Sequence, residues 1–242
     1  MKSLSALLAA VLLTACGGRF AYSGLDRDPL RMYERSATMR SDEPESLFPS
    51  DIAVLNDSAI KRILSYHVTL PHAGRLAVLQ LGDQTVLWRD SEDFSRLNED
   101  LSDSMLAALR RSPRIGRAAL LPAMMVPRQR TIPYLREAAA RYQADLLLGY
   151  RTSCALFRRV RFLKRSQYRT VCSVESILLD TRSGIVPFTV VTTRSQIFER
   201  QKQDFETREA IIKAQFQATQ EALADVATQV GDYLGTVPEN DP

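Results

Sequence analysis

Three apolar, strand-like runs follow one another in the second half of the chain, over residues 146–157, 168–180 and 185–195. Short junctions connect them, and the second junction, Asp180-Thr-Arg-Ser-Gly184, has the residues of a turn. Antiparallel strands can be joined by short connections, whereas parallel strands need long crossovers, so the runs predict an antiparallel meander. The chain must therefore form a sheet, and it needs helices to cover at least one face of that sheet.

One register of the first two runs brings chemically matched residues together. Residues whose numbers sum to 326 would face each other, which gives the pairs Leu148 with Leu178, Arg151 with Glu175, Ser153 with Ser173, and Cys154 with Cys172. Matched pairs across an antiparallel ladder each contribute about 0.2–1 kcal/mol. Four such pairs favour this register over its neighbours.

Helical and strand-like patterns alternate before the meander. Apolar spacing predicts a helix over 57–66 capped by Asp57 or Ser58, a helix from Asp90 or Ser91 to residue 111, and a helix capped by Thr131. Short strands are predicted over 75–81, 85–88 and 118–121. The last helix, over 204–234, would cover the sheet with a stripe formed by Ile212, Phe216, Leu223, Val226, Val230 and Tyr233.

Together these elements predict an α/β (α+β) fold. Its sheet is mixed, with a C-terminal antiparallel meander, and it is packed by helices that include a long C-terminal helix. About 190 residues are enough for one well-buried core. We therefore expect a single domain over residues 51–236, followed by a tail over 237–242.

The first fifteen residues have the three regions of a secretory signal peptide. Lys2 supplies the positive start, residues 4–13 are apolar, and small residues follow. The apolar run is too short to span a bilayer, which takes about 20 residues. We expect residues 1–15 to direct export and then to be removed.

The end of this segment carries a second signal. Leu13-Thr14-Ala15-Cys16 resembles the lipobox of bacterial lipoproteins, in which the cysteine takes up diacylglycerol and becomes the acylated first residue after cleavage. The resemblance implies that Cys16 is lipidated, with chains such as palmitate, and Gly17 after it resembles sorting to the outer membrane. The alternative is an ordinary signal peptide with a chance cysteine.

Residues 17–50 show no sustained periodicity and include Pro29, Pro44 and Pro49. Together with Cys16 they are predicted to form a tether over residues 16–50, which holds the domain at the membrane. Whether Phe20, Tyr22 and neighbouring apolar residues dock on the domain is left open by the sequence.

Export decides how the charge and the cysteines are interpreted. Removal of residues 1–15 takes away only Lys2, so the net charge becomes 31 − 28 = +3, which elsewhere would favour nucleic acid as a ligand. Outside the cytoplasm nucleic acid is not expected, and anionic lipids, cell wall or acidic proteins replace it as partners. In an oxidising compartment the paired Cys154 and Cys172 are expected to form a disulfide. A one-residue slip would instead leave two buried free thiols.

The densest charge cluster lies between the first two strands of the meander. Its six cations, interleaved with Phe157, Phe162 and Tyr168, are Arg158, Arg159, Arg161, Lys164, Arg165 and Arg169. At a hairpin tip they would present a positive, partly aromatic surface to phosphate-bearing lipid, an anionic glycan or an acidic protein. The alternative is a solvated tip, or one paired with the acidic residues near 199–209.

Motifs for catalysis are missing from the sequence. It contains no Gly-x-Ser-x-Gly, His-Glu-x-x-His, Gly-rich phosphate loop or paired-cysteine metal spacing, and His67 and His72 are too isolated to suggest a metal site. We expect no enzyme activity, no catalytic or metal-binding residues and no cofactor.

The order of elements is similar to that of a known class of proteins. A lipobox, a tether, Arg75-Leu-Ala-Val-Leu-Gln-Leu81, and strands that carry Leu178-Leu-Asp-Thr-Arg-Ser-Gly184 resemble the periplasmic α/β lipoproteins of the CsgG and LpoB type, and the rhombotarget lipoproteins. The resemblance covers residues 75–195. It implies either a domain that docks on and activates a cell-wall enzyme or a subunit of an outer-membrane secretion pore.

The sequence therefore predicts a lipid-anchored lipoprotein of the outer membrane of a Gram-negative bacterium, which faces the periplasm. Its expected role is non-catalytic: binding, scaffolding or regulation of an envelope protein or the cell wall. The alternatives are a secretion pore or assembly and a periplasmic enzyme. Six cations in the hairpin would be costly in hydrocarbon, which disfavours the pore.

Overall fold

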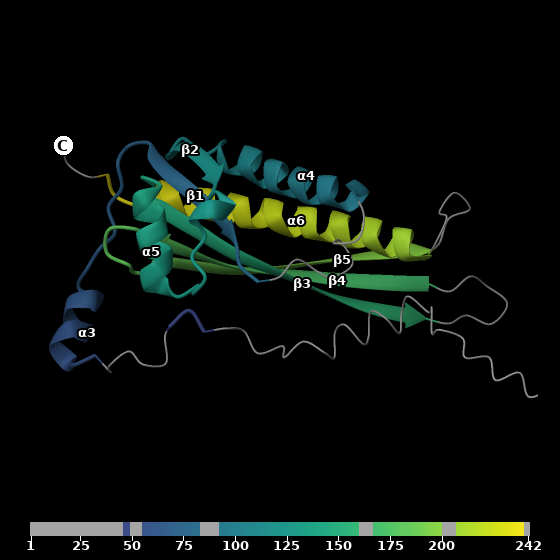
Figure 1. The fold of residues 1–242 in the computed structure, drawn as a ribbon, viewed down its shortest axis with the longest axis horizontal. Coiled ribbons are helices and arrows are strands. Elements are labelled where there is room, and N and C mark those ends of the chain that lie inside the picture. The colour runs from purple at the N-terminus through teal and green to yellow at the C-terminus, as the bar shows by residue number, and fades with distance from the viewer. Residues whose placement is uncertain (1–45, 49–54, 83–91, 160–166, 200–206, 240–242) are drawn as a thin grey trace, which may run out of the picture. The chain divides into compact units, whose positions relative to one another are not determined.

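The computed structural model of the chain describes residues 46–48, 55–82, 92–159, 167–199 and 207–239, without the side chains of 92–98, 158–159 and 207–208 (Figure 1). Contacts divide the chain into Met1–Ser41 and Asp42–Pro242, and every described residue belongs to the second unit. Within the described residues, none of the helices combines the length and the hydropathy that a membrane span requires.

The centre of the fold is a five-stranded mixed sheet. Its strands are β1 (Gly74–Gln80), β2 (Ile115–Leu120), β3 (Leu146–Arg159), β4 (Gln167–Asp180) and β5 (Phe188–Glu199). They lie in the order β2-β1-β3-β4-β5, with β1 parallel to β2 and β3, and with β3, β4 and β5 antiparallel. The predicted mixed sheet with a C-terminal meander is confirmed.

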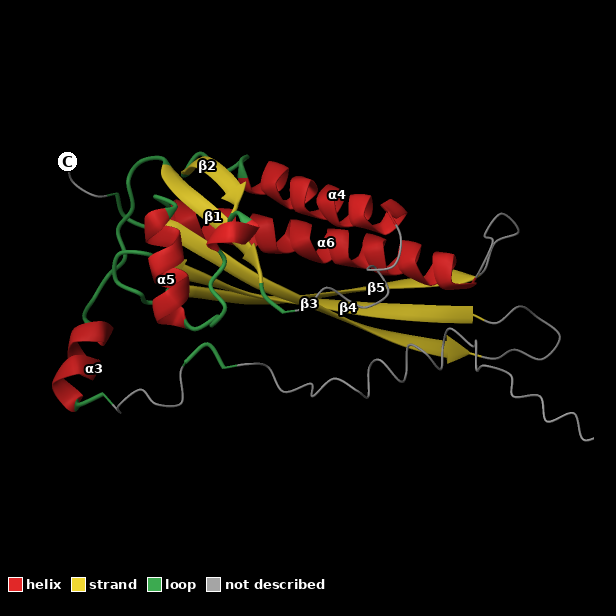
Figure 2. Cartoon of the chain, in the orientation of Figure 1, coloured by secondary structure: helices red, strands yellow, loops and turns green. Residues whose placement is uncertain are grey.

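Helices cover the two faces of the sheet unequally (Figure 2). They are α3 (Asp57–Leu64), α4 (Glu92–Leu109), α5 (Ile132–Arg141) and α6 (Thr207–Thr236), with a short 3-10 helix, η2 (Ala123–Met125). The long helix α6 packs on β4 and β5, and α4 packs beside it. On the opposite face α5 contacts β3, so the helix found there among the described residues covers one end of that face.

The strands pair in the predicted register. Leu148 lies opposite Leu178, Arg151 opposite Glu175, Ser153 opposite Ser173, and Cys154 opposite Cys172. Arg151 and Glu175 form an ion pair at 2.7 Å, and the two cysteines are joined by a disulfide with their Cα atoms 4.1 Å apart. The register holds because a shift by one residue would turn every buried side chain outward.

Element boundaries differ in detail from the prediction. The second strand begins at Ile115 and not at residue 118, and the predicted strand over 85–88 lies outside the described residues. The prediction that Asp57 or Ser58 caps α3 is wrong: the side chain of Asn56 accepts the hydrogen bond from the backbone N–H of Ala59 at 2.9 Å. Thr131 does occupy the cap position of α5, but its hydroxyl makes no cap hydrogen bond.

Two apolar layers build the core. Under α5, the side chains of Ala77, Leu79, Leu147 and Leu179 from three strands meet Leu135 of the helix. On the other face α6 buries four of the six predicted stripe residues, Ile212, Leu223, Val226 and Val230. Phe216 and Tyr233 are only half-buried, and Gln215 is fully buried instead.

The chain remains ordered beyond α6. Glu239 pairs with Leu70 in a parallel bridge, and Val237 is buried. Arg114, itself buried, donates to the carbonyl oxygens of Leu234 (3.3 Å) and Val237 (2.9 Å) and to Glu239 Oε1 (2.7 Å). A guanidinium therefore closes the C-terminal end of α6, where carbonyl groups lack partners within the helix.

Candidate functional site: an open sheet face beside the β3–β4 hairpin

The meander extends far beyond the rest of the sheet. Strand β1 pairs with β3 only from Leu146 to Tyr150, whereas β3 continues to Arg159 and pairs with β4 along its whole length. Strand β5 follows β4 to the same end, where Gln167 lies opposite Glu199. Figure 1 shows this three-stranded extension at the right of the molecule.

One face of the extension is covered by α6. Cys154 and Cys172 lie on this face, where the Cys154 sulfur is 3.7 Å from the Thr219 hydroxyl and the Cys172 sulfur is 3.7 Å from the Gln215 carbonyl oxygen. Cys172 is fully buried. The disulfide therefore ties β3 to β4 beneath the helix, and its place favours a structural role.

The opposite face of the extension lies beyond α5 and is exposed. We call it the open face; it consists of the residues Arg151, Ser153, Ala155, Phe157, Arg169, Val171, Ser173, Glu175, Val191, Thr193, Ser195 and Ile197, which alternate with the covered residues along the three strands. Phe157, Val191 and Ile197 are 57, 67 and 62% exposed. Large apolar side chains at these positions contribute little to the core and are available to a partner.

The register arranges the open face in rows across the three strands. Nearest to the hairpin, Arg169 lies opposite Phe157 on one side and opposite Ile197 on the other. Two rows further on, the hydroxyls of Ser173 and Thr193 are hydrogen-bonded at 2.9 Å. A cation between two exposed apolar side chains, beside a band of hydroxyl groups, is an arrangement suited to a protein partner.

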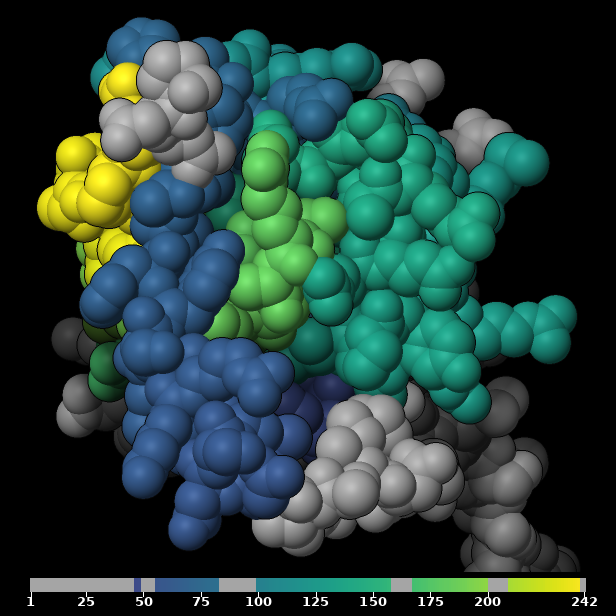
Figure 3. Space-filling view, turned by 90° about the vertical axis from the view of Figure 1, so that its left-hand side faces the viewer, coloured from purple at the N-terminus to yellow at the C-terminus, as the bar shows by residue number. Residues whose placement is uncertain are grey.

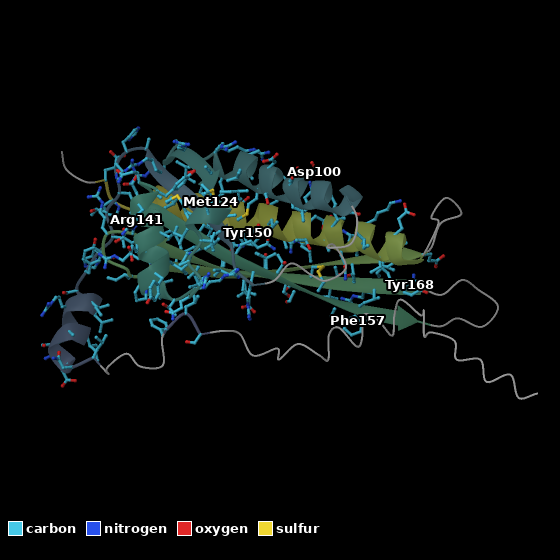
Figure 4. All side chains as sticks on the ribbon, in the orientation of Figure 1. Asp100, Met124, Arg141, Tyr150, Phe157 and Tyr168 are labelled. Carbon is cyan, nitrogen blue, oxygen red and sulfur yellow. A yellow bond between two sulfur atoms is a disulfide. The ribbon has the colours of Figure 1, made fainter. Side chains whose placement is uncertain are left out.

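Phe157 and Tyr168 occupy different faces of this extension (Figure 4). Tyr168 is buried and stacks on Phe198, with the ring centroids 5.4 Å apart. Its aromatic side chain therefore belongs to the packed face. The prediction that Tyr168 contributes to the positive, partly aromatic surface is wrong. Phe157 is the exposed aromatic residue of the pair.

The predicted cationic cluster is only partly placed. Arg169 is exposed on the open face, and the backbones of Arg158 and Arg159 pair with those of Tyr168 and Gln167. Three members, Arg161, Lys164 and Arg165, lie outside the described residues, as do Cys16 and the tether up to residue 45. The lipidation of Cys16 and the binding role of the cluster stay predictions.

Two buried carboxylates at the other end of the meander have structural partners. Asp145 accepts hydrogen bonds from the backbone N–H and the Nε of Arg75 at 2.8 and 3.3 Å. Asp180 accepts from the backbone N–H of Ser183 at 2.9 Å, from the Ser183 hydroxyl, and from the Tyr66 hydroxyl at 3.5 Å. Asp145 therefore fixes the start of β1 beside the start of β3, and Asp180 shapes the turn after β4.

Helix α5 holds the same turn from outside. The guanidinium of Arg136 donates to the carbonyl oxygens of Thr181, at 2.8 Å, and Arg182. Gly184 then takes a positive φ of 78°, a conformation that glycine adopts without steric cost. The predicted Asp180-Thr-Arg-Ser-Gly184 turn is thus locked between sheet and helix.

The pKa shifts of the domain also have structural causes. Burial raises the pKa of Tyr150, against the effect of its hydrogen bond with Ser102. Burial raises the pKa of Tyr233, and the charge of Asp180 raises it further. The hydrogen bond from His72 lowers the pKa of Glu239. No group of three or more His, Cys, Asp or Glu residues able to hold a metal ion occurs in the described part of the chain.

Comparisons with known proteins find similarity in structure only. No protein-family model matches the sequence, and no curated protein matches it. A homologue of the neuraminyllactose-binding hemagglutinin from Helicobacter pylori is similar at 13% identity, with a TM-score of 0.43, over 69% of this chain and 88% of that protein. The PelC dodecamer from Paraburkholderia phytofirmans is similar at 13% identity, with a TM-score of 0.33, over 67 and 94%.

Lipoprotein GNA1162 from Neisseria meningitidis is a further distant match, at 12% identity and a TM-score of 0.35, over 66% of this chain and 99% of that one. The chain is thus distantly similar to bacterial lipoproteins, and the values place it in no family. The finer resemblance to the CsgG and LpoB type stays a prediction.

Proposed function

We propose that this chain is an envelope lipoprotein, anchored through Cys16 to the outer membrane, whose domain binds another envelope protein through the open face without catalysing a reaction. The observation that supports the proposal is the row formed by Phe157, Arg169 and Ile197 at the exposed end of the sheet. Aromatic, aliphatic and arginine side chains are the residue types that dominate binding energy at protein interfaces.

The difference between the two faces of the extension supports a binding role for the open face. The extension has one face closed by α6 and fixed by the disulfide, so the strands are held rigidly while the other face is exposed. Rigid presentation lowers the conformational entropy that binding has to overcome. The open face therefore has the preorganisation of a docking surface.

The charge of the surface favours a partner that places an acidic group opposite Arg169, between apolar groups that contact Phe157 and Ile197. Arg169 is exposed among apolar neighbours, whereas Glu175 is already paired with Arg151 at 2.8 Å. The predicted cations of residues 158–165 would add positive charge at the same end. Complementary charges of this kind raise the rate of association and its sensitivity to salt.

Photo-crosslinking in intact cells tests the proposal. A photoreactive amino acid in place of Phe157 or Val191 should yield one crosslinked envelope protein. The same residue in place of Gln217, which is exposed on α6, should not yield it. With the purified partner, the double variant Phe157→Ser/Ile197→Ser should bind about tenfold or more weakly, as expected for the loss of central apolar contacts.

The controls separate binding from folding. Because Phe157 and Ile197 are more than half exposed, their replacement should leave the thermal midpoint close to that of the natural chain. Lys213→Ser, on the exposed side of α6, is the matched control and should bind normally. Equal crosslinking from residue 217, or unchanged binding by the double variant, would refute the open face as the binding surface.

A further inference from the structure

The short helix α3 has an apolar side that the domain does not bury. Ala59, Ile60, Ile63 and Leu64 share one side of the helix, at spacings of one and four residues. Ile60 and Ile63 are 42% exposed and Leu64 is 76% exposed, and none of the eight residues of α3 is buried. Such a helix is amphipathic without using its apolar side for the protein core.

Exposed apolar residues also flank the helix at both ends. Leu55 before it and Tyr66 after it are 49 and 41% exposed. Figure 3 shows α3, in blue, as a projection at the bottom of this end of the molecule. Large apolar side chains therefore gather on one exposed segment of twelve residues, from 55 to 66.

Local interactions alone do not account for a helix at this place. The Asn56 cap satisfies one N–H group at its beginning, but isolated helices shorter than about 12 residues are marginal in water. The Tyr66 hydroxyl, 3.5 Å from Asp180 Oδ2, connects the segment to the end of β4. The helix would gain stability from a surface that accepts its apolar side.

We propose that this surface is the anionic bilayer that carries the chain's own lipid anchor, so that α3 lies in the membrane interface and orients the domain. The inference rests on the proposed anchoring through Cys16. Amphipathic helices bind at such an interface with the apolar side inserted and with cations on the polar side. The polar side of α3 has two cations, Lys61 and Arg62, and one acid, Asp57.

The tether makes even weak membrane affinity sufficient. Leu47 packs on the core cluster under α5, and its carbonyl oxygen accepts a hydrogen bond from the Ile132 N–H at 2.8 Å. Thirty residues, 17–46, therefore separate Cys16 from this first contact with the domain, and the predicted tether of this length would have a root-mean-square reach of about 30 Å. Anchoring converts the second contact into an intramolecular one, with an effective concentration on the millimolar scale. A helix too short to hold a free protein on a bilayer can then hold an anchored one.

The place of α3 determines which end of the domain would face the membrane. Tyr66 links α3 to Asp180, the last residue of β4, whereas the hairpin leaves from the opposite end of that 14-residue strand. At about 3.3 Å per residue the two ends are about 45 Å apart. Docking through α3 therefore leaves the open face and hairpin free for a periplasmic partner.

A fluorescent label on each side of the helix tests the inference. The acylated mature protein is reconstituted in vesicles of phosphatidylethanolamine and phosphatidylglycerol, with the environment-sensitive dye NBD on Leu64→Cys or, as matched control, on Ser58→Cys, which is exposed on the polar side of α3 and leaves both cations in place. We expect emission at position 64 to rise about twofold or more on vesicles, and to fall with doxyl-labelled phospholipid, because the apolar side enters the interface. The control at position 58 should change much less.

A second variant probes the charge. Lys61→Gln/Arg62→Gln should reduce the emission of the position-64 label on vesicles with phosphatidylglycerol and not on vesicles of neutral lipid alone, because each cation near an anionic surface adds attraction. Both side chains are exposed, so circular dichroism and the thermal midpoint should match those of the parent. Equal emission of parent and variant on anionic vesicles would contradict the assigned role of the two cations.

The outcomes separate a failure of α3 to dock on the bilayer from a failure of the lipid anchor. Protein that floats with the vesicles while position 64 stays in water would overturn docking by α3 and leave the anchor intact. Emission that rises but is not quenched by doxyl lipid would show that protein covers the helix, which also overturns the inference. Protein that fails to float at all would refute both the anchor and the helix contact.

Discussion

Removal of the Cys154–Cys172 disulfide should destabilise the domain by a predictable amount. The bond joins residues 18 apart in sequence, and in the chain-entropy model a loop of this size accounts for about 3 kcal/mol of the free energy of unfolding. A domain of about 190 residues unfolds with an entropy near 0.4 kcal/mol per kelvin, so the thermal midpoint should fall by about 8 °C.

Two forms of the protein separate the bond from the packing of its sulfur atoms. The reduced natural chain retains both sulfur atoms and loses only the bond. The variant Cys154→Ala/Cys172→Ala also loses the contacts of the Cys172 sulfur, which is fully buried under α6, and should unfold at the same temperature or lower. Differential scanning calorimetry of the mature protein measures both midpoints.

A count of free thiols should accompany the calorimetry, to show whether the disulfide is present before reduction. Alkylation of the unreduced, unfolded chain followed by intact-mass measurement should find no free thiol at positions 154 and 172. Two alkylatable thiols there would show that the bond is absent in solution. A midpoint shift below about 2 °C, with the bond shown to be present before reduction, would refute the entropic estimate.

Four other changes test single contacts. Arg114→Met should lower the free energy of unfolding by roughly 2–4 kcal/mol in urea, because the C-terminal carbonyl groups of α6 lose a buried charged donor. Gly184→Ala should cost about 1–2 kcal/mol in the same assay, because φ is 78° there. The raised pKa of Tyr150 stabilises the fold below pH 10.0, its ordinary pKa, and this contribution is lost as the pH rises through the folded-state value. In the variant Tyr150→Phe, the free energy of unfolding should therefore fall less steeply at alkaline pH than it does in the parent. The lowered pKa of Glu239 stabilises the fold above pH 4.5, its ordinary pKa, and this contribution is lost as the pH falls through the folded-state pKa. The free energies of unfolding of Glu239→Gln and of the parent should therefore converge in acid.

The meander could be predicted from sequence because its information is local and redundant. The pairs Arg151 with Glu175 and Cys154 with Cys172 each indicate the register independently, and both occur in the structure. The long amphipathic pattern of α6 likewise specifies a helix with one buried side. Periodicity identifies such elements wherever the same side of an element is buried along its length.

Features that depend on contacts between distant segments escaped the prediction. Residues 237–239 looked like a tail because they are few and partly polar, yet Arg114, more than a hundred positions earlier, binds their backbone and side-chain oxygens. Gln215 is buried although its side chain is polar, which a pattern of apolar residues cannot indicate. Its side-chain nitrogen and oxygen have no hydrogen-bond partner among the described residues.

The open face was missed for a related reason. Along β5, residues alternate between the two faces of the sheet, and valines occur on both: Val190 is buried under α6 and Val191 is 67% exposed. Alternation reveals that a strand has two faces, but it does not reveal which face a helix covers. That choice depends on where α5 and α6 come to lie, which is decided by the whole chain.

Among the described residues, the apolar side of α3 and the hairpin end of the open face lie toward opposite ends of the same strand. At the Asp180 end of β4, α3 presents apolar side chains next to two cations, and at the Gln167 end the open face presents Phe157 and Ile197 around Arg169. A bilayer selects for exposed apolar area beside positive charge, whereas a protein partner selects for a rigid, shaped surface. The short helix fits the first requirement and the disulfide-fixed sheet fits the second. A lipoprotein built in this way would hold its binding surface at a set distance from the membrane, and the length of β4 would define that distance.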